Sequence, residues 1–192
     1  MIQNFEINSD QIDKKKITSE EKKFRNENLK IFNSLGFPNK RLEDWKFSDL
    51  KNIIDTNFDQ LDTTEVTHNI KKIDLIKDFD HNFIFLVNGK LHSNNFNYED
   101  KSKIKLIPSC NGTNFKPSKN ALVCLNHALS ENGYSLEIEK NYKFKKILVI
   151  YNFFTKEVKN KILNNKNEIK IGQGSEIHIL EYTINKSKFI NN

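Results

Sequence analysis

The sequence contains one pair of residues with the spacing of a metal site, Cys124 and His127. A cysteine and a histidine three positions apart can each supply one ligand, because thiolate and imidazole are common metal ligands. However, Cys124 lies inside the apolar run ALVCLNHAL, residues 121–129, where a free cysteine usually packs as a small hydrophobic side chain. We favour core packing, and the alternative is a stand-alone metal- or ligand-binding β protein that uses Cys124 and His127.

The other candidate residues do not form a pattern that supports catalysis. Cys110 follows Pro108 in a loop-like segment and is the better reactive thiol, but a nucleophile also needs a neighbouring base. The turn at residues 172–174 lacks the third glycine or the lysine of a phosphate-binding loop. The remaining histidines stand apart from one another in the sequence, at His68, His81, His92 and His178. We therefore predict no enzymatic activity and no catalytic, cofactor-binding or metal-binding residue in this chain.

The composition argues against a secreted protein, a membrane-spanning protein and a nucleic-acid-binding protein. The 192 residues include only two cysteines, and the start lacks both a basic leader and a long apolar stretch. A reduced, cytoplasmic protein that does not span a membrane is expected. The net charge of +6 could suit nucleic acid, but only Arg25 and Arg41 among the 31 basic residues are arginine. Because base and phosphate recognition favours the arginine fork, we expect no nucleic-acid binding.

The N-terminal part has the signals of two helices. Thr18 and Glu21 form a capping-box pattern, and Gly36 predicts the end of the first helix. Apolar residues follow the cap at helical spacing, at Phe24, Ile31 and Leu35. A second helix or helical turn is predicted over residues 44–54, and residues 55–72 are interpreted mostly as loop. The second element would place four apolar side chains on one face, those of Trp45, Leu50, Ile53 and Ile54.

Beyond residue 81 the apolar pattern changes to short runs that are typical of strands. The run at residues 82–87 ends in Asn88-Gly89, the dipeptide that best fits a type I′ turn, so a hairpin is predicted. Further strands are predicted at residues 104–108, 134–138, 146–151, 168–171 and 176–182. The run at residues 121–129 could be a buried helix by its apolar content alone, which does not separate a buried helix from a strand. This spacing is typical of a sandwich, a barrel or a β-solenoid. A solenoid enzyme would carry clustered carboxylates on one face, and these strands show none.

Residues 36–50, GFPNKRLEDWKFSDL, resemble the N-terminal signature of the SufB/SufD family of iron–sulfur cluster assembly scaffold proteins, most like SufD. The signature has a helix ending at Gly-hydrophobic-Pro, then basic residues, acids, Trp-Lys-aromatic and Ser-x-Leu. Segments LVNGKL at 86–91, ALVCLNHALSENGY at 121–134 and GQGSEIHILEY at 172–182 resemble later family segments in the same order. The family's turn glycine is replaced by Asn141, and the proline expected near Glu139 is missing.

This resemblance implies a fold and a function. The implied fold is α+β, with an N-terminal helical subdomain followed by the beginning of a right-handed parallel β-helix, truncated at the C-terminus. We divide the chain into residues 1–80 (mainly helical), 81–120 (hairpin and connecting segment) and 121–192 (start of the β-helix core). The implied function is that of a non-catalytic scaffold subunit in a complex with SufB and the ATPase SufC. A transient iron–sulfur cluster would belong to the intact complex, and none would be bound by this fragment.

The last residues support the expectation that something is missing. The strand pattern continues to residues 182–184, and the chain stops at residue 192 without a helix or a polar cap. Proteins usually cover an open apolar strand edge, because such an edge aggregates. We therefore expect either a truncated chain or a partner at this edge.

Overall fold

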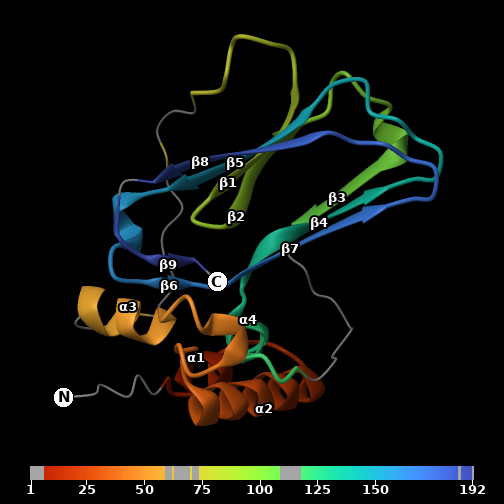
Figure 1. Cartoon of the computed structure of the whole chain (residues 1–192). Helices are drawn as coiled ribbons and strands as arrows, with labels where there is room; N and C mark the ends of the chain where they lie inside the picture. Colours follow the sequence, from red (N-terminus) through yellow and green to blue (C-terminus); the bar gives the residue numbers. More distant parts are fainter. Residues whose placement is uncertain are drawn as a thin grey trace.

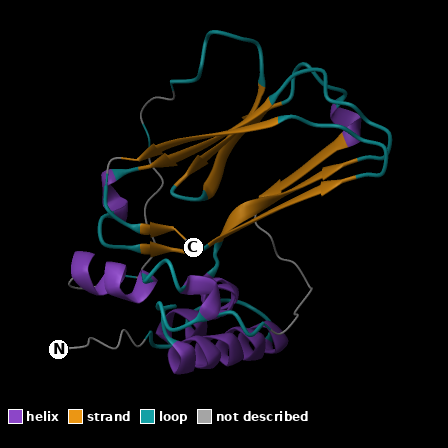
Figure 2. Ribbon diagram, viewed as in Figure 1, coloured by secondary structure: helices purple, strands orange, loops and turns teal. Residues whose placement is uncertain are grey.

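The computed structural model describes residues 7–58, 62, 70, 74–108, 118–185 and 187–191. Its α-helices gather in one layer, and the larger sheets lie together on one side of that layer (Figure 1 and Figure 2). The α-helices are α1 (Asp10–Asp13), α2 (Ser19–Leu35), α3 (Leu50–Asn57) and α4 (Ala121–Leu129). Three short 3₁₀ helices are also described, η1 (Glu43–Trp45), η2 (Lys101–Lys103) and η3 (Lys156–Val158).

Helix α2 begins and ends where the sequence predicts. The Oγ1 atom of Thr18 accepts a hydrogen bond from the backbone N–H of Glu21 at 3.1 Å. Gly36 ends the helix with a φ of 67° and donates its N–H to the carbonyl oxygen of Phe32. The predicted apolar stripe is wrong at its last member, since Leu35 is 55% exposed. The buried residues of α2 are Asn28, Leu29 and Phe32.

The predicted helix at residues 44–54 is wrong in its extent. The chain forms η1, leaves the helical conformation, and then enters α3 after Asp49. The carboxylate of Asp49 accepts a hydrogen bond from the N–H of Asn52 at 3.0 Å, so it caps a new helix. Ile54 is buried but Ile53 is exposed, so the predicted shared apolar face does not form. Most of the loop predicted at residues 55–72 lies outside the described residues.

The helical layer has its own apolar core. Although α4 is far from α2 in the sequence, both helices contribute to this core, together with α1 and α3. The fully buried members, each with no exposed surface, are Ile12, Phe32, Ile54, Cys124, Leu125 and Ala128. The run at residues 121–129, whose apolar content left helix and strand open, is therefore a buried helix.

The described strands form two larger sheets and one small one. The first sheet has the order β2-β1-β5-β8, the second has the order β3-β4-β7, and β6 pairs with β9. The strands are β1 (Asn82–Val87), β2 (Lys90–Asn95), β3 (Ile104–Pro108), β4 (Asn132–Ile138), β5 (Leu148–Phe154), β6 (Ile162–Leu163), β7 (Asn165–Ile171), β8 (Ile179–Asn185) and β9 (Ile190–Asn191). The predicted strands are thus all present, with small shifts of their ends.

The hairpin between β1 and β2 is confirmed in detail. Asn88 and Gly89 adopt φ values of 51° and 83°, the two positive angles that a type I′ turn requires. The turn places β2 antiparallel to β1, with Val87 opposite Lys90.

Alternate residues of the two larger sheets meet in a shared core. From the first sheet come Ile84, Leu86, Leu148 and Ile150, and from the second Tyr134, Leu136 and Ile138. The opposite face of the first sheet carries Phe85, Val87, Val149 and Tyr151, and it is covered by Ile70, Leu75 and Ile76. Within the second sheet, Gly133 of β4 has a φ of 136° and lies against the backbone carbonyl of Lys166 in β7.

The predicted right-handed parallel β-helix is wrong, although the chain is α+β as expected. A parallel β-helix needs strands that all run in one direction, whereas β2 runs antiparallel to β1 and β3 antiparallel to β4. The physical reason is local: the tight Asn88-Gly89 turn can only join antiparallel neighbours. The parallel pairs β1–β5, β5–β8 and β4–β7 extend these antiparallel pairs into mixed sheets, and none of the described sheets closes.

Candidate functional site

Helix α4 carries the two residues that the sequence suggests for a metal site. Its first turn is capped by Asn120, whose side chain accepts hydrogen bonds from the N–H groups of Leu122 and Val123. Its C-terminal end is held by hydrogen bonds from a side chain of another helix, α2. Both ends of α4 are therefore fixed by polar contacts, which hold Cys124 and His127 in place.

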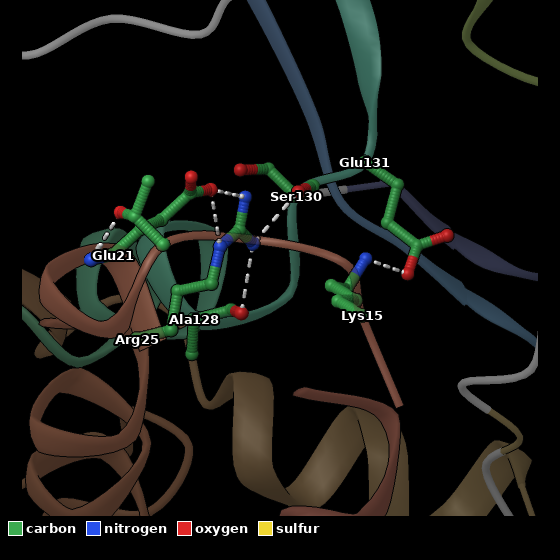
Figure 3. A network of polar contacts seen from close by, with 7 residues as sticks. Lys15, Glu21, Arg25, Ala128, Ser130 and Glu131 are labelled. Atoms are coloured by element: carbon green, nitrogen blue, oxygen red, sulfur yellow. Dashed lines mark hydrogen bonds and ion pairs between the residues drawn. The ribbon is translucent and has the colours of Figure 1, made fainter. Parts of the chain in front are cut away.

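The contact at the C-terminal end of α4 comes from Arg25 of α2 (Figure 3). Its Nη1 donates to the backbone carbonyl oxygens of Ala128 at 3.1 Å and Ser130 at 2.9 Å. Glu21, one turn earlier on α2, pairs with the same guanidinium at 2.9 Å and so orients it. Carbonyl groups at the end of a helix lack partners within the helix, and Arg25 satisfies two carbonyls in this region. Lys15 and Glu131 form an ion pair next to it.

Arg25→Lys is expected to lower the free energy of unfolding by about 2 kcal/mol. A lysine lacks the planar guanidinium with which Arg25 contacts two carbonyl oxygens and Glu21 at once. Arg41→Lys is the matched control, since Arg41 is exposed and its side chain makes no described hydrogen bond or ion pair; its effect should stay within about 0.5 kcal/mol. Urea denaturation of the two variants measures the difference. Equal effects would show that the bonds to Ala128 and Ser130 contribute nothing.

Cys124 packs in the helical core. It has no exposed surface, and its thiol donates a hydrogen bond to the carbonyl oxygen of Ser118 at 3.3 Å. Burial raises the pKa of this thiol, so the thiolate that binds a metal is disfavoured.

His127 is used differently, although it lies one turn away. Its ring contacts the ring of Phe24, with centroids 5.4 Å apart. Burial, and then the positive charge of Lys166, lower the pKa of His127, so the ring stays neutral. Its Nδ1 atom is buried and has no hydrogen-bond partner among the described residues. Within those residues no cluster of three or more His, Cys, Asp or Glu side chains could hold a metal ion.

Cys124→Ala is expected to leave the metal content of the purified protein unchanged and to lower the free energy of unfolding by about 1 kcal/mol, because it removes one buried atom from a packed core. Elemental analysis by mass spectrometry and urea denaturation measure the two quantities. Cys110→Ala serves as the control for losing a thiol. A bound metal that disappears only in Cys124→Ala would restore the ligand hypothesis.

The carboxylate of Glu99 is buried and accepts hydrogen bonds from four groups, although the sequence pattern does not single this residue out. Its carboxylate accepts hydrogen bonds from Asn82 Nδ2 at 2.8 Å, Tyr142 OH at 2.8 Å and the N–H groups of Lys145 and Lys146 at 3.0 and 3.1 Å. Burial alone would raise the pKa of Glu99, but these hydrogen bonds outweigh it and hold the pKa below its ordinary value. Through these four donors Glu99 ties the start of β1 to the segment that precedes β5.

Three of the other histidines, His81, His92 and His178, lie in the described part of the chain. Nε2 of His81 lies 2.8 Å from the hydroxyl of Tyr151, which also accepts a hydrogen bond from the N–H of Ile76. Burial raises the pKa of Tyr151, so it remains protonated. His92 and His178 are exposed on the surface. The reactive-thiol candidate Cys110 and the isolated His68 lie outside the described residues.

Residues 36–50 are divided between the core and the surface. Phe37 and Pro38 are buried, and the Phe37 ring packs edge-on against Phe32 at 5.1 Å. Leu42 is exposed, and Phe47 is 92% exposed, with the Lys46 ammonium 5.2 Å from the centre of its ring. Exposed aromatic and aliphatic side chains of this kind suit protein contacts and not chemistry.

Comparisons with known proteins identify the family. The sequence model for the SufBD protein N-terminal region matches residues 1–150, which include the segment at residues 36–50. A search of curated proteins found no match. Within the described residues, no helix combines the length and the apolar composition that crossing a membrane requires. Because the match covers most of the chain, the protein belongs to the SufBD family and contains the N-terminal region of that family.

Proposed function

We propose that the chain acts in iron–sulfur cluster assembly as a non-catalytic scaffold subunit of the SufD type, in a cytoplasmic complex with SufB and SufC. The observation that carries this proposal is the family match over residues 1–150. Iron and the nascent cluster would be cargo of the assembled complex, and this chain would bind no cofactor of its own.

The described side chains agree with a structural role. Three polar groups that could do chemistry already have hydrogen-bond partners: Glu99 has four donors, Cys124 the carbonyl of Ser118, and His81 the hydroxyl of Tyr151. Meanwhile large apolar side chains such as Phe47 are exposed. Exposed apolar side chains of this kind are suited to binding other proteins.

Genetic complementation tests the SufD assignment. The chain would be expressed in two bacterial strains, one lacking SufD and one lacking SufB, under iron limitation that makes growth depend on the complex. We expect partial rescue of the SufD-less strain and none of the SufB-less strain. Rescue of the SufB-less strain alone would overturn the SufD assignment, and rescue of neither would count against the scaffold role of this chain.

Co-purification tests the partners directly. A tagged chain co-expressed with SufB and SufC is expected to capture SufB. Gly133→Ala, which we expect to disrupt the fold, is the control, because an unfolded chain can bind SufB non-specifically through its exposed apolar residues. Capture by the unfolded variant as strong as by the parent would contradict a specific complex.

A further inference from the structure

The segment before β1, residues 74–81, lies across the outer face of the first sheet, and we call it the strap. In Figure 1 it is the yellow arch on the side of this sheet that faces away from the second sheet. Its Leu75 and Ile76 pack, together with Ile70, against the four buried side chains of that face. None of the described strand pairings includes residues 74–81, so the strap covers the sheet without extending it.

One hydroxyl group of the sheet contacts the strap at two points. The Tyr151 hydroxyl in β5 accepts the N–H of Ile76 at 3.0 Å and lies 2.8 Å from Nε2 of His81. Nδ1 of His81 lies 2.9 Å from the carbonyl oxygen of Phe79. Because a carbonyl oxygen can only accept, Nδ1 carries the hydrogen of the neutral ring, and Nε2 accepts a hydrogen bond from the hydroxyl. A phenylalanine at residue 151 would therefore lose both bonds to the strap.

The strap is much less buried than the face that it covers. The four covered side chains of the sheet are at most 2% exposed. In the strap, by contrast, Leu75 and Ile76 are only partly buried, and residues 77–80 are exposed. A folded protein opens first where few apolar side chains are buried and no ladder of backbone hydrogen bonds holds the segment. We therefore expect the strap to open more readily than the sheet beneath it.

Opening would uncover a group of aromatic rings. The Phe85 ring stacks on the rings of Tyr151 and Phe153, with centroids 5.9 and 6.4 Å away. The Phe83 ring contacts Tyr151 edge-on, with centroids 6.4 Å apart. All four residues belong to the apolar cluster against which the strap packs. The strap thus keeps an apolar, aromatic surface out of water, and its release would expose that surface.

We propose that residues 74–81 are a strap that opens and closes as a unit over the folded first sheet, and that the Tyr151 hydroxyl holds it closed. In the closed state the chain itself covers the aromatic face. In the open state this face is accessible while the strands of the sheet stay paired. The proposal does not depend on the proposed function, because it concerns contacts within the purified chain alone.

Thiol labelling at two neighbouring positions of β5 tests the opening. In a Cys110→Ser background, Val149→Cys places a thiol on the covered face, whereas Ile150→Cys places one in the core between the two larger sheets. We expect residue 149 to be labelled at least about tenfold faster than residue 150, because only the strap has to open. Peptide mass spectrometry separates these labels from that of the buried Cys124. Equal rates would show that the face is uncovered only when the chain unfolds, which would overturn the proposal.

Tyr151→Phe in the Val149→Cys chain tests the hydroxyl. Loss of its two hydrogen bonds is expected to raise the labelling rate at residue 149 about tenfold. Tyr142→Phe is the matched control, because the Tyr142 hydroxyl also accepts a backbone N–H, that of Asp100 at 2.7 Å, and donates to Glu99 at 2.8 Å. Neither partner belongs to the strap, so this control should leave the rate within about twofold of the parent. Equal acceleration by the two variants, or none by Tyr151→Phe, would overturn the role of Tyr151.

Discussion

Gly133→Ala is expected to lower the free energy of unfolding by about 4 kcal/mol, or to prevent folding. Two causes act together. Gly133 has a φ of 136°, which side-chain-bearing residues rarely adopt. A Cβ atom at this position would also overlap the backbone carbonyl of Lys166, so β7 would have to move away from β4. Backbone cannot yield as a flexible side chain can, and the core between the two larger sheets would open.

Gly36→Ala provides the matched control for this prediction. Gly36 also has a positive φ, of 67°, but a Cβ atom there would meet nothing within 4 Å. Only the backbone strain remains, and the expected loss is about 1 kcal/mol. Urea denaturation of both variants separates strain from overlap. If the two alanine variants lose equal stability, the close approach of β4 and β7 is not what requires glycine at residue 133.

Glu99→Gln is expected to lower the free energy of unfolding by about 3 kcal/mol. The carboxylate receives four donors, from the side chains of Asn82 and Tyr142 and from the backbone at residues 145 and 146. A glutamine keeps one acceptor oxygen, but its NH₂ group would face donors that it cannot satisfy. Glu139→Gln is the control, because Glu139 is exposed and pairs only with Lys103 at the surface. Its effect should stay below about 1 kcal/mol.

The pH dependence of stability tests the same contact. The pKa of Glu99 is lowered in the folded protein, so the stabilisation by its carboxylate is fully present above the pKa of glutamate in the unfolded chain. It is lost as the pH falls through the lower folded pKa. The parent should therefore lose stability in acid more steeply than Glu99→Gln, which has no carboxyl group to protonate. Identical acid profiles of the two proteins would contradict the role of Glu99.

Local structure was predictable wherever the signal lay within a few residues. The Thr18 cap, the Asn88-Gly89 turn and the runs that became β4 and β5 each depend on near neighbours in the sequence. The second predicted helix was wrong in its extent because Asp49 caps a new helix, α3, in the middle of the predicted range. The spacing of apolar residues alone does not show where a helix begins. Leu35 matched the helical spacing, but the buried stripe of α2 runs through Leu29 and Phe32.

Long-range contacts were not predictable. The four donors to Glu99 lie 17 to 47 positions away in the chain, and no local pattern connects them. The β-helix came from the family resemblance and not from a repeat in the residues, and the antiparallel pairs β1–β2 and β3–β4 overturn it. The Cys124 and His127 spacing was visible, but only the structure shows that the sulfur bonds to Ser118 while the ring contacts Phe24.

The parallel pairing of β1 with β5 has a consequence for biosynthesis. Asn82 pairs with Leu148, so the first sheet cannot form beyond its hairpin until the ribosome has released the chain past residue 154. At about 5–20 residues per second, the hairpin waits several seconds with its apolar faces uncovered. Contacts of such sequence separation also slow folding. The nascent hairpin is therefore the stage at which we expect this chain to need chaperone protection.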